Sequence, residues 1–286
     1  MNHMEIQSNK TRVKEIKDGI AKLYNEQYYQ NGTCIFFQDC KKGIQTNINN
    51  GYVFSFAARI GENYSLQLGD EQIRIVVVGK ENPRRNLINT PPARLIEWEN
   101  IKRGVNLHYR ETYRLLCAML NYNWDSENRC LADHKKYVYK PDAVLTAFTL
   151  TNQYRCAFKD YPDQVRNIKN TPTQEKNCTL FLKNELEVLN PTILVIQTDK
   201  LKATDIFGGN GLIPCANIDG FYLHQETGCH IIEMVHPAFI KGWYKENFPR
   251  LLDAIDYLRG ENKLPPSSYS TTDILNSLVK FSNSGQ

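Results

Sequence analysis

A long apolar run is absent from this 286-residue chain. No segment of about 18 consecutive apolar residues occurs, so a transmembrane helix is not expected. The first ten residues are polar and lack the apolar core of a signal peptide. These two absences predict a cytoplasmic protein that does not bind a membrane.

A strong excess of one charge is absent as well. The formal net charge is +4 at pH 7, with a sequence pI of about 8.5. Such a mildly basic balance permits nucleic-acid binding without requiring it. The hydrophobic share of 41% supports a substantial core in a chain of this length.

Glycine-rich phosphate loops are also missing. Neither G-x-x-x-x-G-K-S/T nor G-x-G-x-x-G occurs, which disfavours a nucleotide-binding enzyme that uses the loop at Gly79. No internal repeat or coiled-coil pattern is present, so a monomer is expected. Disulfides are not expected among the eight cysteines, because the cytoplasm keeps thiols reduced. Those cysteines are expected to be buried or to bind a metal.

Apolar runs alternate with helical patterns along the chain, which predicts a parallel sheet with helices on both faces. The α/β class expected is a three-layer α/β/α fold with a central, mostly parallel four-stranded sheet. Three regions are expected, namely an N-terminal helical segment (1–30), the α/β/α domain (31–260) and a peripheral tail (261–286). Strands are expected at 52–58, 73–78, 142–150, 192–197 and 230–235. Helices are expected at 11–28, 111–121, 173–189 (capped by Thr173), 201–207 and 244–258, with long loops at 82–104 and 152–173.

Polar residues follow three of the expected strands. Glu81 and Asn82 come after 73–78, Asn152 after 142–150 and His236 after 230–235. Ligands of open α/β sheets bind where the strands end at their carboxyl edge. We therefore expect these residues to form one site at one rim of the sheet.

Four segments of the chain resemble the motifs of one known superfamily, and they occur in the same order. They are I-R-I-V-V-V-G-K-E-N-P (73–83), L-T-N-Q-Y-R-C (150–156), C-T-L-F-L-K-N-E-L-E-V-L-N-P (178–191) and M-V-H-P-A-F-I (234–240). At these segments the chain resembles the uracil-DNA glycosylase superfamily, and most closely its iron–sulfur branch, families 4 and 5. The resemblance spans roughly residues 34 to 258.

Two departures from that branch concern the substrate. The first loop, from Gly79 to Pro83, is one residue longer than the G-E-A-P of the branch, so either Glu81 or Asn82 could position the attacking water. The G-R-P-F segment that supplies a base-stacking phenylalanine is missing, and Tyr109 is the best aromatic candidate for its role. Both departures leave the target base open.

The resemblance implies an iron–sulfur cluster. Four thiolates hold a 4Fe-4S cluster, and the positions that match the branch are Cys34, Cys40, Cys156 and Cys178. The spacing alone favours buried structural cysteines instead, because the first pair lies further apart than in the branch. A zinc site at Cys215, Cys229 and His230 is a further alternative.

The resemblance also implies roles for the site residues. Glu81 or Asn82 would hold the water, Glu81 would stabilise the cationic sugar, and His236 would donate to the departing base. The base would be bound by Gly79, Lys80, Pro83, Tyr109 and Asn152. DNA would be contacted by Arg84, Arg85, Arg155, Pro237 and Ala238.

The function expected is that of a DNA glycosylase. It would hydrolyse the N-glycosidic bond of a flipped-out uracil or modified base and leave an abasic site. A bulky modified base of viral DNA would make it a defence enzyme. The alternative is a nucleic-acid-binding protein that keeps the fold without the hydrolysis.

Overall fold

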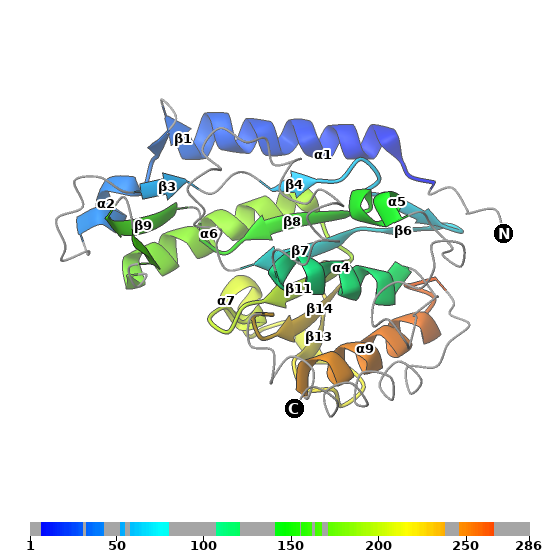
Figure 1. The fold of residues 1–286 in the computed structure, drawn as a ribbon. Coiled ribbons are helices and arrows are strands. Elements are labelled where there is room, and N and C mark those ends of the chain that lie inside the picture. Colours follow the sequence, from blue (N-terminus) through cyan, green and yellow to red (C-terminus); the bar gives the residue numbers. More distant parts are fainter. Residues whose placement is uncertain are drawn as a thin grey trace.

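The computed structural model describes residues 7–30, 33–42, 52–54, 58–79, 107–120, 141–154, 156–161, 164–167, 171–237 and 246–265. A large sheet runs through the molecule, with helices on both of its faces (Figure 1). The α/β class predicted from the sequence is therefore confirmed. No helix within the described stretches is long and apolar enough to cross a membrane.

The sheet has seven strands in the order β12-β13-β14-β11-β7-β8-β4. Four central strands run parallel: β14 (Cys229–Met234), β11 (Ile193–Gln197), β7 (Ile75–Gly79) and β8 (Phe148–Asn152). Antiparallel strands extend both edges: β13 (Phe221–His224), β12 (Leu212–Pro214) and β4 (Arg59–Ile60). The expected four strands thus correspond to the parallel centre of a wider sheet.

Two hydrophobic cores lie on opposite faces of this sheet. One core packs the sheet against α4 (Leu107–Leu120) and α9 (Phe248–Gly260). The other packs it against α1 (Lys10–Lys22), the π-helix η1 (Leu23–Tyr28), α6 (Pro172–Leu189) and α7 (Ala203–Phe207). Strand β7 is apolar throughout, and β11 is apolar up to Gln197, because both faces of these strands are covered.

Smaller elements surround this framework. The chain near α6 forms β1 (Tyr29–Gln30), β2 (Thr33–Cys34), α2 (Phe37–Lys42), β3 (Tyr52–Phe54), β9 (Cys156–Tyr161) and β10 (Gln164–Asn167). Three more elements are the strands β5 (Leu66–Leu68) and β6 (Glu71–Ile73) and the helix α5 (Pro141–Thr146).

Several sequence-based expectations were wrong. Residues 142–146 form α5 rather than a strand, because Pro141 suits the first position of a helix. The expected loop at 152–173 contains β9 and β10. The cap of α6 is Thr171, not Thr173: its side chain accepts a hydrogen bond from the Gln174 backbone N–H, and Pro172 follows it.

A buried carboxylate joins distant parts of the chain. Glu185 of α6 is 0% exposed. It accepts hydrogen bonds from the Tyr24 hydroxyl (2.7 Å), the Ala58 backbone N–H (3.2 Å) and the Thr151 hydroxyl. The N-terminal helices therefore share a core with α6 and the sheet.

Candidate functional site at the carboxyl edge of the sheet

The four parallel strands end side by side. Gly79, the last residue of β7, lies opposite Asn152, the last residue of β8. Gln197 ends β11 opposite Met234, which ends β14. The register between β7 and β11, with Val78 opposite Ile196, brings Gly79 next to Gln197. The strand ends thus form one row: Asn152, Gly79, Gln197, Met234.

This row faces α4 rather than α6. Alternate residues of a strand point to opposite faces, and Val77, Val195 and Ile232, which lie two residues before the row, belong to the core beneath α4 and α9. Met234 belongs to the same core. Gln197 accepts a hydrogen bond through its Oε1 from the Thr112 hydroxyl of α4, at 2.9 Å. The candidate site therefore lies between the strand ends and the first turns of α4.

The first turns of α4 add two buried polar residues. Glu111 and Thr112 are both almost fully buried. The amino terminus of a helix carries a partial positive charge, and α4 begins at Leu107, close to this edge. Tyr109, the candidate base-stacking residue, is in the first turn of α4, and its side chain lies outside the described residues.

A second row of polar groups supports the edge. The Gln153 backbone N–H donates to the carbonyl oxygen of Gly79 at 2.7 Å. The Thr198 hydroxyl donates to Gln153 Oε1 at 3.2 Å. These bonds tie the exits of β7, β8 and β11 together, which fixes the spacing of the residues in the first row.

His236 lies just beyond β14 and is half-buried, and Pro237 after it is buried. Three strand spacings of about 4.8 Å separate the ends of β14 and β8, so the backbones of Met234, two residues before His236, and Asn152 lie roughly 14 Å apart across the edge. That span is wide enough for an aromatic ring held by side chains from both sides.

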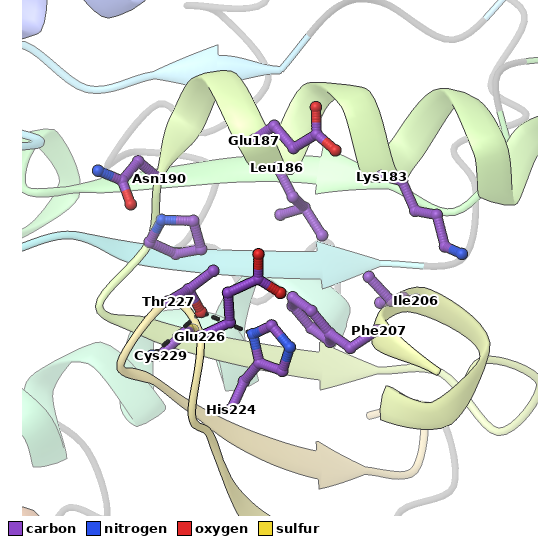
Figure 2. Close-up of a pocket in the computed structure, with 11 residues that line it drawn as sticks. Lys183, Leu186, Glu187, Asn190, Ile206, Phe207, His224, Glu226, Thr227 and Cys229 are labelled. Atoms are coloured by element: carbon purple, nitrogen blue, oxygen red, sulfur yellow. Dashed lines mark hydrogen bonds between the residues drawn. The ribbon is translucent and has the colours of Figure 1, made fainter. Parts of the chain in front are cut away.

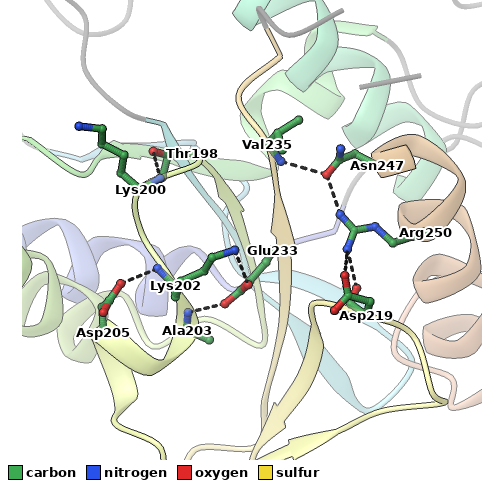
Figure 3. Close-up of polar contacts among 10 residues, drawn as sticks. All are labelled: Thr198, Lys200, Lys202, Ala203, Asp205, Asp219, Glu233, Val235, Asn247 and Arg250. Carbon is green, nitrogen blue, oxygen red and sulfur yellow. Dashed lines mark hydrogen bonds and ion pairs between the residues drawn. The ribbon is translucent and has the colours of Figure 1, made fainter. Parts of the chain in front are cut away.

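The exit of β14 is held from two sides (Figure 3). The Val235 backbone N–H donates to Asn247 Oδ1 at 3.0 Å, and Arg250 donates to the same oxygen at 2.8 Å. Glu233, on the opposite face, accepts from the Ala203 backbone N–H at 2.6 Å and from Lys202 Nζ at 3.1 Å. These contacts fix the segment that leads into His236.

Several residues implied by the resemblance lie outside the described residues. They are Lys80, Glu81, Asn82, Pro83, Arg84, Arg85, Arg155 and Ala238. The described part of the proposed site consists of Gly79, Asn152, His236 and Pro237. Gln197 and Thr112 were not predicted, although a polar residue at the end of the run I-L-V-I-Q is the same signal that pointed to Asn152.

The four cysteines proposed as cluster ligands are in β2, α2, β9 and α6. Cys34, Cys40 and Cys178 are buried, and α2 packs against α6, where Asn177 Nδ2 lies 3.7 Å from Cys40 Sγ. Burial is the main reason that the pKa of the Cys40 thiol is raised; Asn177 lowers it and Asp39 raises it further. The backbone of Cys156 is in β9, and its side chain is not described.

Within the described stretches, no group of three or more His, Cys, Asp or Glu side chains is arranged to hold a metal ion. The alternative zinc site does not fit, because Cys215 and Cys229 lie in cores on opposite faces of the sheet. Burial also raises the pKa of the Cys229 thiol to about 12, which disfavours the thiolate that zinc requires.

Two cavities lie on the α6 side of the sheet. A groove of about 470 Å³ borders Gln153 at the carboxyl edge and carries both basic residues, such as Lys176 and Lys200, and acidic ones. A cavity of about 490 Å³ lies between α6, α7 and the β13–β14 hairpin, where His224 Nδ1 is 2.9 Å from the Thr227 hydroxyl (Figure 2). Neither cavity is lined by Asn152, Gln197 or His236.

Comparison with known proteins found no family model that matches this chain and no significant match among curated proteins.

Proposed function

We propose that the protein is a DNA glycosylase that hydrolyses the N-glycosidic bond of a flipped-out uracil or modified base. The observation that supports this most is the arrangement at the carboxyl edge. Asn152 and Gln197 flank Gly79 on neighbouring strands, and His236 follows the next strand along. A glycine between two amides leaves room for a planar ring.

The chemistry of base excision suits these side chains. Breaking the bond leaves positive charge on the sugar and negative charge on the base. A preorganised donor to the departing base is worth a few kcal/mol, and His236, as a neutral imidazole, can donate there. Asn152 offers both a donor and an acceptor to the base edge. Glu81 or Asn82 would hold the attacking water.

We also propose that Cys34, Cys40, Cys156 and Cys178 hold a 4Fe-4S cluster. The support is that the three described cysteines are buried and that α2, which carries Cys40, packs against α6, which carries Cys178. The cluster would act structurally by tying α2 and β9 to α6, since metal binding is coupled to folding. Iron and sulfide analysis of protein purified without oxygen tests this, with Cys178→Ala expected to lose both; metal-free protein with intact folding would contradict it.

The decisive experiment is an excision assay. DNAs that carry uracil or hypermodified phage bases are incubated with the protein and then with alkali, which cleaves abasic sites. Strand breaks with one base would establish the activity and identify the substrate. A folded protein that binds DNA but leaves no abasic site would instead favour the non-catalytic binding protein.

A matched pair of variants assigns the chemistry to the carboxyl edge. His236→Gln is expected to lower the excision rate by about a hundredfold or more, because a donor to the leaving base is displaced. His224→Gln changes a histidine at the cavity on the α6 side and is expected to leave the rate unchanged. Equal rates in the two variants would place the active site elsewhere.

A further inference from the structure

Gln197 is the last residue of the central strand β11, and its side-chain amide has an acceptor oxygen, Oε1, and a donor nitrogen, Nε2. The side chain is 0% exposed. Its Oε1 accepts from the Thr112 hydroxyl, whereas its Nε2 has no hydrogen-bond partner among the residues that the structure describes. A buried donor without a partner costs free energy, and native proteins keep few of them. Such a group at a ligand-binding edge points to a ligand that supplies the acceptor.

The hydrogen bond from Thr112 fixes the direction of the unused donor. Because Thr112 occupies the oxygen of the amide, the nitrogen faces away from that hydroxyl. Gln153 follows β8. Its Oε1 accepts a hydrogen bond from the Thr198 hydroxyl on the opposite side of the edge. Gln197 is therefore the buried amide on the α4 side whose donor is available.

The spacing of the strands suits a single aromatic ring. Asn152 and Gln197 are on β8 and β11, which flank β7, so their backbones lie roughly 10 Å apart. The residue between them is Gly79, which contributes no side chain. Two amides at this separation can reach a pyrimidine from two sides.

The pose of a flipped-out base determines which atom meets Gln197. The glycosidic nitrogen must stay with the sugar at the mouth of the site. In a pyrimidine the ring position opposite that nitrogen is C4, so the substituent on C4 points to the deepest part of the site. Uracil and thymine carry a carbonyl acceptor there, and cytosine carries an amino donor.

We propose that Gln197 Nε2 donates to the C4 carbonyl oxygen of the bound base, which makes Gln197 a specificity-determining residue for uracil, thymine and their 5-substituted derivatives against cytosines. This inference rests on the proposed function and adds the chemical class of the base. Thr112 is the positioning residue that orients the amide.

The test compares single-base substrates and matched variants. Excision kinetics are measured on DNAs that differ only in uracil or cytosine at one site. Gln197→Leu removes the donor and is expected to lower kcat/KM on uracil DNA by about tenfold or more. Gln197→Glu replaces the donor with an acceptor and is expected to shift the preference toward cytosine. Thr112→Val, which frees the amide to rotate, is expected to cause a smaller loss in the same direction.

The control is Thr149→Val. Thr149 is another buried residue whose hydroxyl lacks a partner, but it lies inside β8 and away from the carboxyl edge. This variant is expected to match wild type on both DNAs. A Gln197→Leu protein that behaves like Thr149→Val would overturn the inference.

A binding measurement separates this inference from the proposed function. If wild-type protein releases no base from any DNA, the glycosylase proposal fails. The dissociation constants of the same two DNAs then decide the role of Gln197. A loss of about tenfold that is confined to uracil DNA in Gln197→Leu supports it, and equal binding of both DNAs by wild type and variant overturns it.

Discussion

Glu185 and Gln197 are both fully buried polar side chains against the same sheet, one on each face. Glu185 accepts hydrogen bonds from an N-terminal helix, from the chain before β4 and from β8. Gln197 accepts one hydrogen bond from α4 and leaves its donor without a partner.

This difference separates a structural polar cluster from a candidate binding site. A satisfied buried network rigidifies a core, and each of its members depends on the others. A buried donor without an acceptor, such as Gln197 Nε2, adds nothing to stability. A ligand that supplies the acceptor is the better explanation for its presence at a strand exit. Four measurements test this difference between the two side chains.

The largest effect is expected at the satisfied cluster. Glu185→Leu leaves the donors of Tyr24, Ala58 and Thr151 buried without their acceptor, and each such loss costs about 1–3 kcal/mol. We expect the free energy of unfolding, measured with urea, to fall by about 3 kcal/mol or more. Glu187→Leu, at an exposed position of the same helix, is the control and should change it by less than about 0.5 kcal/mol.

A smaller loss is expected when a single partner is removed. Thr151→Val and Tyr24→Phe should each lower the free energy of unfolding by about 1 kcal/mol. In combination with Glu185→Leu they should add almost nothing, because the carboxylate that they contact is already gone. Fully additive losses in this double-mutant cycle would mean that the cluster does not act as a unit.

At the unsatisfied group, only a small effect on stability is expected. Gln197→Leu leaves the Thr112 hydroxyl without its acceptor but also removes a buried donor that lacks a partner, so the two changes partly offset each other. The free energy of unfolding should stay within about 1 kcal/mol of wild type. A loss as large as that of Glu185→Leu would show that Gln197 is structural after all.

The smallest effect concerns His230, the second residue of β14, which is buried and stacks against Phe221. Burial lowers the pKa of His230; Lys263 lowers it further, and Glu261 raises it. The unfolded chain therefore takes up this proton first, and stability should decline as the pH falls below about 6.5 toward the folded pKa. His230→Phe should remove that part of the pH dependence, which urea unfolding at pH 5 to 8 measures. An unchanged pH profile would mean that another group causes the decline.

The sequence predicted the strand exits better than the buried polar groups. Asn152 and His236 follow apolar runs, and the structure has both at the carboxyl edge of the sheet. Gln197 ends an apolar run as Asn152 does, but only Asn152 also lies in a segment that resembles a known motif, so Gln197 was missed. Glu185 and Thr112 were missed because polar residues in a helical pattern are usually exposed, and only the tertiary fold reveals their partners.

The errors in the fold have a similar origin. Residues 156–167 are mostly polar, so β9 and β10 show no apolar period, and their backbone pairing decides the structure instead. The hairpin of β13 and β14 was only half predicted, because β13 has just four residues, F-Y-L-H, and they do not alternate between apolar and polar. Short antiparallel edge strands depend on their neighbours more than on their own composition.

The hydrogen bond between Tyr24 and Glu185 spans 161 residues of the chain. A ribosome adds about 5 to 20 residues per second, so α1 leaves the ribosome roughly ten to thirty seconds before α6 can receive it. During that interval the apolar stripe of Val13, Ile16 and Ile20 has no native surface to cover it. Production of the protein in cells should therefore depend on chaperones that shield nascent chains, and slower synthesis at low temperature should not by itself remove that dependence.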